Sequence, residues 1–110
     1  MKLPNREQAI VKESKIKEYL LSDTHVIGKT KAAFFNAVGY SLHEWQELQK
    51  DLIKVAFQYD VNSEITTEFG VKYTIDGVIE SPSGKEINIR TVWIIEKNKN
   101  IPYLITAYPR

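Results

Sequence analysis

Helical and strand-like patterns are segregated along this chain, and their order restricts the fold more than any other feature. Apolar residues recur at helical spacing up to about residue 59, whereas apolar and polar residues alternate from about residue 63 onwards. Short turns separate the strand-like runs, which is typical of antiparallel neighbours. The sequence therefore predicts an α+β fold in which N-terminal helices, within about 13–59, pack on one face of a four-stranded antiparallel meander, within about 63–108.

The helical half is expected to contain three helices. Periodicity predicts one helix over about 13–21 and a second, short helix that begins near Thr30 and ends at Gly39, where glycine suits a left-handed C-terminal cap. The third helix has the clearest start, because Ser41 and Glu44 have the spacing of a capping box and an apolar stripe follows to about residue 59.

The alternation of side chains along a strand predicts which residues share a face. Arg90 is expected on the open face of the sheet, and Thr91 and Trp93 on the more apolar face, which the helices cover. In the last strand, one face is expected to carry Leu104, Thr106 and Tyr108, and the other Tyr103, Ile105 and Ala107. The four strands are predicted over about 65–69, 71–79, 86–96 and 103–108.

Composition excludes several classes of protein. The 110 residues suit one domain, 1–110, and Met1 favours a free-standing protein. The chain has no cysteine, which excludes disulfides, a thiolate nucleophile and cysteine-ligated zinc. A net charge of +1 gives no overall attraction to nucleic acid, so an anion site must be a local cluster. The sequence contains neither a signal peptide nor an apolar run of bilayer length, and predicts a cytoplasmic protein without metal, cofactor or membrane contact.

The segment from His25 to Lys31 carries the first candidate site. His25 can act as a general acid or base near neutral pH, and the alternative is a loop histidine that hydrogen-bonds locally. Gly28, Lys29 and Lys31 lie at the expected start of the second helix, where backbone N–H groups and positive charge favour an anion. The alternative for both lysines is an ordinary solvated charge. A P-loop is excluded, because its first glycine and its preceding strand are missing from the sequence.

Further candidates lie on the strands. Arg90 can bind a phosphate through two parallel hydrogen bonds, unless it pairs with an aspartate or glutamate. Thr106 and Tyr108 can also bond a phosphate, and Tyr108 can stack on a base, unless their hydroxyls are satisfied at the strand edge. Thr91 and Trp93 are candidates for substrate binding, and the alternative is that both belong to the core.

Four segments of the chain resemble a small bacterial family of unknown function, DUF6883. They are YLLSDTH at 19–25 with its continuation to Phe35, the Gly/Ser/Pro pattern over 77–84, IRTVW at 89–93 and TAYP at 106–109. The resemblance covers nearly the whole chain. It indicates membership and implies no activity.

The order of elements and the residue types are more distantly similar to the barnase–EndoU–colicin–RelE group of metal-free ribonucleases, many of which are toxins. This resemblance implies RNA cleavage through attack of the 2′-hydroxyl, with RNA and a cognate antitoxin or immunity protein as partners. His25 would be the acid or base, while Lys31 and Arg90, with Lys29, would hold the phosphate. Thr106 and Tyr108 would complete the catalytic set, and substrate would be bound by Gly28, Lys29, Thr91 and Trp93. The competing hypothesis is a non-enzymatic interaction module, such as an immunity or accessory protein.

Overall fold

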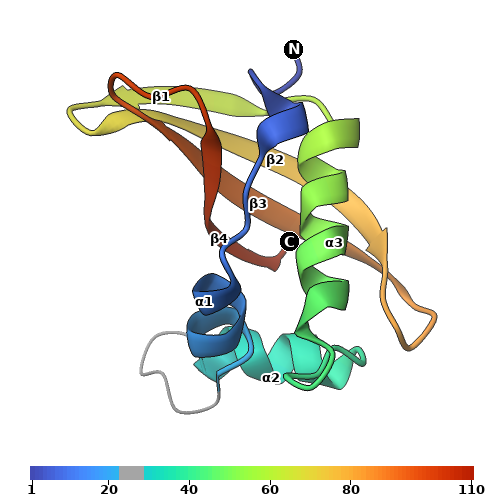
Figure 1. The fold of residues 1–110 in the computed structure, drawn as a ribbon. Coiled ribbons are helices and arrows are strands. Elements are labelled where there is room, and N and C mark those ends of the chain that lie inside the picture. Colours follow the sequence, from blue (N-terminus) through green and yellow to red (C-terminus); the bar gives the residue numbers. More distant parts are fainter. Residues whose placement is uncertain (23–28) are drawn as a thin grey trace.

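The computed structural model describes residues 1–22 and 29–110. Its sheet is an antiparallel meander with the strand order β1-β2-β3-β4, as the sequence predicts (Figure 1). The strands are β1 (Ser63–Thr67), β2 (Gly70–Glu80), β3 (Glu86–Glu96) and β4 (Pro102–Pro109). The two central strands pair along their full length, from Gly70 opposite Glu96 to Glu80 opposite Glu86.

The helices of the described residues precede the strands and lie on one side of the sheet (Figure 1). They are the 3₁₀ turn η1 (Arg6–Gln8), α1 (Glu13–Lys15), η2 (Ile16–Leu20), α2 (Lys29–Ala37) and α3 (Trp45–Gln58). The helix predicted over 13–21 is present, but most of it, η2, is a π-helix. A π-helical turn is wider than an α-helical one and is frequent at functional sites.

The end of α2 confirms the predicted glycine cap. Gly39 has a φ of +102°, and its N–H bonds to the Asn36 carbonyl at 3.0 Å. The Tyr40 N–H bonds to the Phe35 carbonyl at 3.0 Å, and the rings of Tyr40 and Phe35 meet edge to face at 6.0 Å. These contacts form a Schellman motif with its hydrophobic partner pair, which turns the chain sharply from α2 towards α3.

The predicted capping box before α3 is present in part. The Glu44 N–H donates to the Ser41 hydroxyl at 3.2 Å, but the α-helix itself begins later, at Trp45. The predicted apolar stripe is confirmed, because the residues of α3 that face the sheet are buried: Leu48, Leu52, Val55 and Ala56.

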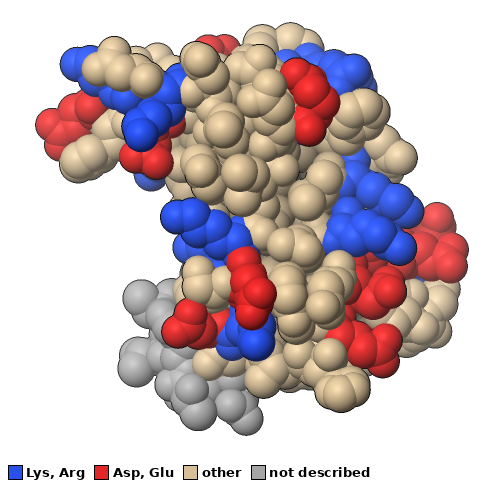
Figure 2. All heavy atoms as spheres, in the orientation of Figure 1, with Lys and Arg blue, Asp and Glu red and all other residues tan. Residues whose placement is uncertain are grey.

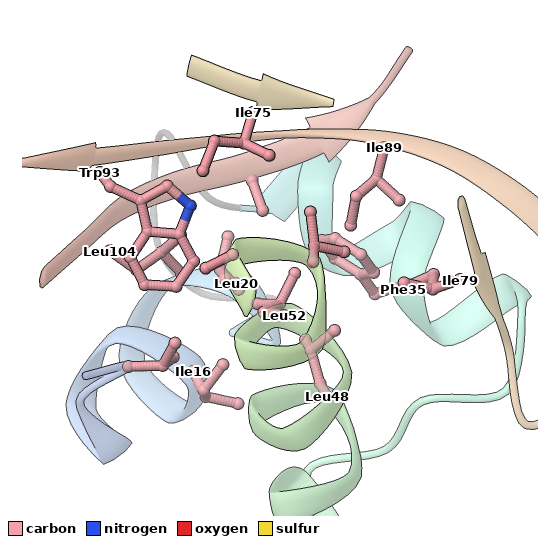
Figure 3. Packing of buried hydrophobic residues seen from close by; sticks show 14 of the residues in the cluster. Ile16, Leu20, Phe35, Leu48, Leu52, Ile75, Ile79, Ile89, Trp93 and Leu104 are labelled. Atoms are coloured by element: carbon pink, nitrogen blue, oxygen red, sulfur yellow. The ribbon is translucent and has the colours of Figure 1, made fainter. Parts of the chain in front are cut away.

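The core lies between the helices and the sheet (Figure 3). Trp93 on β3 is fully buried among apolar side chains from the helices and from β4. Its indole N–H donates to the Thr91 hydroxyl at 2.8 Å, and that hydroxyl donates to the Ile75 carbonyl at 2.8 Å. Thr91 is also fully buried. The alternative in which Thr91 and Trp93 belong to the core therefore agrees with their positions, and no surface of either is open to a substrate.

The last strand departs from the predicted alternation because of a β-bulge. Val92 pairs with Thr106, but the next residue, Trp93, pairs with Leu104, so Ile105 has no partner. Leu104 therefore lies on the buried face, whereas Thr106 lies on the open face. The prediction that these two share a face was wrong, since one extra residue in one strand reverses the alternation.

Candidate functional site

Residues from the helices and from β4 converge beside the bulge. The Lys31 ammonium donates to the Tyr19 phenol oxygen at 2.9 Å, and that oxygen lies 3.4 Å from the Thr106 hydroxyl. The same ammonium lies 5.9 Å from the centre of the Tyr108 ring. We call Tyr19, Lys31, Thr106 and Tyr108 the Tyr19 cluster; all four side chains are partly exposed. It joins η2 and α2 to β4, which is distant from both in the sequence.

Buried neighbours on each element fix these positions. Leu20, which follows Tyr19 in η2, and Ala32, which follows Lys31 in α2, have no exposed surface. On β4 the buried Ala107 separates Thr106 from Tyr108, so both polar residues point away from the core. Each member of the Tyr19 cluster is therefore held by an adjacent residue that the core fixes.

The surroundings of Tyr19 change the acidity of its phenol. Partial burial alone would raise the pKa of Tyr19, but the hydrogen bonds with Lys31 and Thr106 and the charges of Lys31 and Lys15 outweigh it. The net effect is a pKa lowered from the usual value of a tyrosine. The ammonium groups of Lys15 and Lys31 lie 5.0 and 5.1 Å from the centre of the Tyr19 ring. A phenol in this setting is a better proton donor than a solvated tyrosine.

Arg90 lies next to the Tyr19 cluster, directly opposite Tyr108 in the pairing of β3 with β4. Its Nε and Nη2 atoms donate to the two carboxylate oxygens of Asp76 at 2.7 and 2.9 Å. Arg110 also reaches Asp76, at 3.2 Å. Arg90 is on the open face, as predicted, and the alternative of an ion pair with an acidic residue is confirmed. Arg90 also remains 33% exposed.

The three charged groups of this ion pair network leave a net positive charge. The hydrogen bonds from Arg90 lower the pKa of Asp76, and partial burial raises it. The charges of Arg90 and Arg110 lower it further, so that the pKa of Asp76 is below its usual value. Asp76 in turn raises the pKa of Arg90, and Tyr108 adds to the effect. A guanidinium carries five N–H donors, and Asp76 takes two of those of Arg90. Arg90 therefore keeps N–H donors that Asp76 does not occupy.

The structure thus brings together four of the predicted residues: Lys31, Arg90, Thr106 and Tyr108. It also adds two that sequence reasoning missed, Tyr19 and Asp76. Tyr19 matched the apolar stripe of its helix, and Asp76 alternates with apolar residues as a surface residue would. His25, Gly28 and the side chain of Lys29 lie outside the described residues.

A separate polar hollow of about 370 Å³ lies between α3 and the turn that joins β2 to β3. The Tyr40 hydroxyl in its wall donates to Asp51 at 2.5 Å, and burial followed by this bond raises the pKa of Tyr40. No predicted site residue is among its described lining residues.

Within residues 1–22 and 29–110, no group of three or more histidine, aspartate or glutamate side chains is placed to hold a metal ion. No helix in these ranges is long and apolar enough to cross a bilayer.

The fold and the Tyr19 cluster define an α+β protein with a basic, hydroxyl-rich candidate site at the edge of an antiparallel sheet. The chain belongs to the family described as Domain of unknown function (DUF6883), which it matches over residues 2–110. No curated protein matches it in sequence. It is similar to a chain of the solved structure described as "Contact-dependent growth inhibition toxin - immunity protein complex from Klebsiella pneumoniae 342", with a TM-score of 0.73 and 15% identity over 96% of both chains. At this identity the match shows a shared fold.

Proposed function

We propose that this protein is a metal-independent endoribonuclease that acts as a toxin in the bacterial cytoplasm. The observation that carries the proposal is the Tyr19 cluster, in which a lysine and two hydroxyls meet beside the Tyr108 ring and a partly exposed arginine. Cations and hydroxyl donors in one place suit a phosphodiester whose charge increases in the transition state.

The proposed reaction begins with attack of the ribose 2′-oxygen on the adjacent phosphorus. The bond from phosphorus to the 5′-oxygen then breaks, giving a 2′,3′-cyclic phosphate and a free 5′-hydroxyl. A base takes the proton of the 2′-hydroxyl, and an acid supplies one to the 5′-oxygen. Lys31 and Arg90 stabilise the anionic transition state, and Thr106 and Tyr108 donate hydrogen bonds to the phosphate oxygens.

Two groups are assigned to proton transfer. Tyr19 is the proposed acid, because its hydrogen bond from Lys31 stabilises the phenolate that remains after the proton has left. His25 is predicted from the sequence as the acid or the base, and with Tyr19 as the acid it becomes the proposed base. Lys29 remains a predicted phosphate ligand on the sequence argument alone.

A cognate partner protein that blocks this activity is part of the proposal. The structurally similar chain comes from a complex of a contact-dependent growth inhibition toxin with an immunity protein. A complex of that kind fits the proposed pairing of a toxin with a protein that neutralises it.

The second candidate function is a non-enzymatic interaction module of such a system. It is favoured by apolar side chains at the free edge of the sheet, where Ile65 is 60% and Phe69 is 68% exposed. β1 is an edge strand, and exposed edges can pair with another chain. The similar structure is a complex that includes an immunity protein as well as a toxin, so it fits this candidate too.

Expression in bacteria from a tightly repressed promoter separates the two candidates. Wild-type protein should arrest growth and fragment cellular RNA, whereas Lys31→Ala should do neither while remaining soluble. Lys54→Ala is the matched control, since Lys54 is an exposed lysine on α3. Healthy growth with intact RNA from soluble wild-type protein would reject the ribonuclease and favour the interaction module.

A further inference from the structure

Lysines lie over tyrosine rings along β4, both within the Tyr19 cluster and beyond it. The Lys12 ammonium lies 5.1 Å from the centre of the Tyr103 ring at the start of β4, and Lys15 and Lys31 lie over Tyr19. Tyr108 at the far end of β4 completes the series. We call these six residues the Lys–Tyr strip: Lys12, Lys15, Tyr19, Lys31, Tyr103 and Tyr108.

The bulge in β4 is what places both ends of the strip on one face. Tyr103 and Tyr108 are separated by an odd number of positions, so a regular strand would put them on opposite faces. Because Ile105 is the extra residue, Tyr103 pairs with Ile94 and Tyr108 with Arg90, and both face away from the core. Bulges of this kind redirect side chains next to functional sites.

The N-terminal segment brings Lys12 to Tyr103. Ile10 forms a parallel bridge with Tyr103, and its backbone bonds to Pro102 and Leu104 at 2.9 and 3.0 Å. Lys12 is exposed and Tyr103 is partly exposed, so both can meet a ligand. Figure 2 shows positively charged atoms over the region where α1 and β4 lie in Figure 1, although charges of both signs are mixed across that face.

We propose that the Lys–Tyr strip binds a single-stranded segment of the RNA substrate, with Lys12 and Tyr103 as a subsite away from the chemistry. Aromatic rings stack on bases, and lysines pair with phosphates, without reading sequence. Tyr103 and Tyr108 pair with Ile94 and Arg90, which are four positions apart on β3. At about 3.3 Å for each position, the two tyrosines are about 13 Å apart along the sheet, which is longer than a dinucleotide step at about 3.4 Å. The strip therefore spans several nucleotides. It favours unpaired strands, because the bases of a duplex are already stacked.

This inference rests on the proposed function, but its test uses binding. The probe is a fluorescent DNA octanucleotide of mixed sequence, which lacks the 2′-hydroxyl and so is not cleaved. Anisotropy should show that wild-type protein binds the single strand at least about 10-fold more tightly than the same strand in a duplex. Tyr103→Leu, which keeps an apolar side chain and removes the ring, should weaken binding about 10-fold, the size expected for one stacked base.

Lys12→Glu provides a second variant that leaves the sheet untouched, because Lys12 is exposed. It should also weaken binding, by about 10-fold. The matched controls are Lys54→Glu and Phe57→Leu on α3, which should bind within about twofold of wild type. Thermal melting of every variant shows that it is folded.

The outcomes distinguish the two proposals when cleavage of cellular RNA is measured in parallel. Variants that bind like wild type, or equal binding of single strand and duplex, would overturn the Lys–Tyr strip even if wild-type protein cleaves RNA. Binding that depends on Tyr103 and Lys12, without cleavage by wild-type protein, would support the strip and reject the nuclease. No binding of the single strand would also overturn the strip and leave β4 as a surface for a protein partner.

Discussion

Among single residues, the Tyr19 phenol has the most unusual surroundings. It is the shared partner of Lys31 and Thr106, and a second ammonium, that of Lys15, lies over its ring. The hydrogen bond from Lys31 fixes the direction of the phenol oxygen, and the two positive charges favour its deprotonated form. A tyrosine that only packed against the core would not need this arrangement.

Replacement of Tyr19 by phenylalanine tests the role of this phenol. Tyr19→Phe keeps the ring and removes the oxygen, so RNA cleavage should fall about 100-fold or more, the usual contribution of a general acid. The free energy of unfolding should fall by only about 1 kcal/mol, the net value of a typical hydrogen bond. Single-turnover cleavage rates and urea unfolding measure the two effects.

The matched control is Tyr59→Phe, at the C-terminal end of α3. The Tyr59 hydroxyl donates a hydrogen bond to the Val78 carbonyl at 3.2 Å, but it has no lysine partner in the described residues. This variant should cleave RNA at the wild-type rate. Equal rates for both variants would remove the Tyr19 phenol from the reaction.

The ion pair network of Asp76 predicts how stability depends on pH. The pKa of Asp76 is lowered in the folded protein, so its contribution is present above the unfolded-state pKa of about 4 and is lost as pH falls through the folded-state value. Asp76→Asn should therefore cost about 1–2 kcal/mol at pH 7, because it leaves the Arg90 and Arg110 charges without a carboxylate.

Urea unfolding at pH 7 and at pH 3 or below measures this difference. The gap between wild type and Asp76→Asn should narrow at the lower pH, where the wild-type carboxylate becomes protonated. A gap that is the same at both pH values would show that the ion pairs do not stabilise the fold and that the variant acts by another route.

At the scale of elements, the sequence predicts what depends on a regular period and misses what depends on an interruption. The bounds of β3 agree with the predicted 86–96, because its long run of β-branched residues contains no Gly or Pro and lies between two turns. The bulge at Ile105 and the π-helical turn around Tyr19 each change the local period by one residue. No residue type in either segment marks that change.

The same limit applies to the candidate site. Alternation correctly placed Arg90 on the open face, and Lys31 lies in the first turn of the second helix, as predicted. Tyr19 was out of reach of sequence reasoning, because its partners Lys31 and Thr106 are 12 and 87 positions away and meet it only through packing of η2 and α2 beside β4. A pattern of local spacing carries no information on such contacts.

The Schellman motif at the end of α2 gives a prediction for an element. Gly39→Ala should destabilise the protein by about 1–3 kcal/mol, because an L side chain is strained at its φ of +102°. A Cβ there would also lie 3.0 Å from the Ser83 nitrogen and 3.1 Å from the Pro82 Cβ atom. Urea unfolding at neutral pH measures the loss.

Gly84→Ala separates the two causes. Gly84 also has a positive φ, +88°, but a Cβ there would meet no atom within 4 Å, so its replacement reports the backbone strain alone. Gly39→Ala should therefore cost more than Gly84→Ala. A larger loss of stability for Gly84→Ala than for Gly39→Ala would mean that Pro82 and Ser83 move away from the new Cβ atom at position 39 without a cost in free energy.

At the scale of the whole molecule, charge is distributed rather than concentrated. The net charge is +1, and Figure 2 shows lysine and arginine side chains interspersed with acidic ones. A protein with this distribution has little non-specific attraction to nucleic acid. Binding must then come from a few local cations with aromatic neighbours, and this is the composition of the Lys–Tyr strip.

That distribution predicts a shallow dependence of binding on salt. If Lys12, Lys15 and Lys31 each pair with one phosphate, the logarithm of the binding constant for a single strand should fall with the logarithm of salt concentration with a slope of about −2. Lys12→Glu should make the slope shallower by about 0.7, whereas Lys54→Glu should leave it unchanged. Anisotropy titrations with the DNA octanucleotide at several salt concentrations give these slopes. A slope near zero, or one that responds equally to both variants, would show that the strip is not the surface that holds the phosphates.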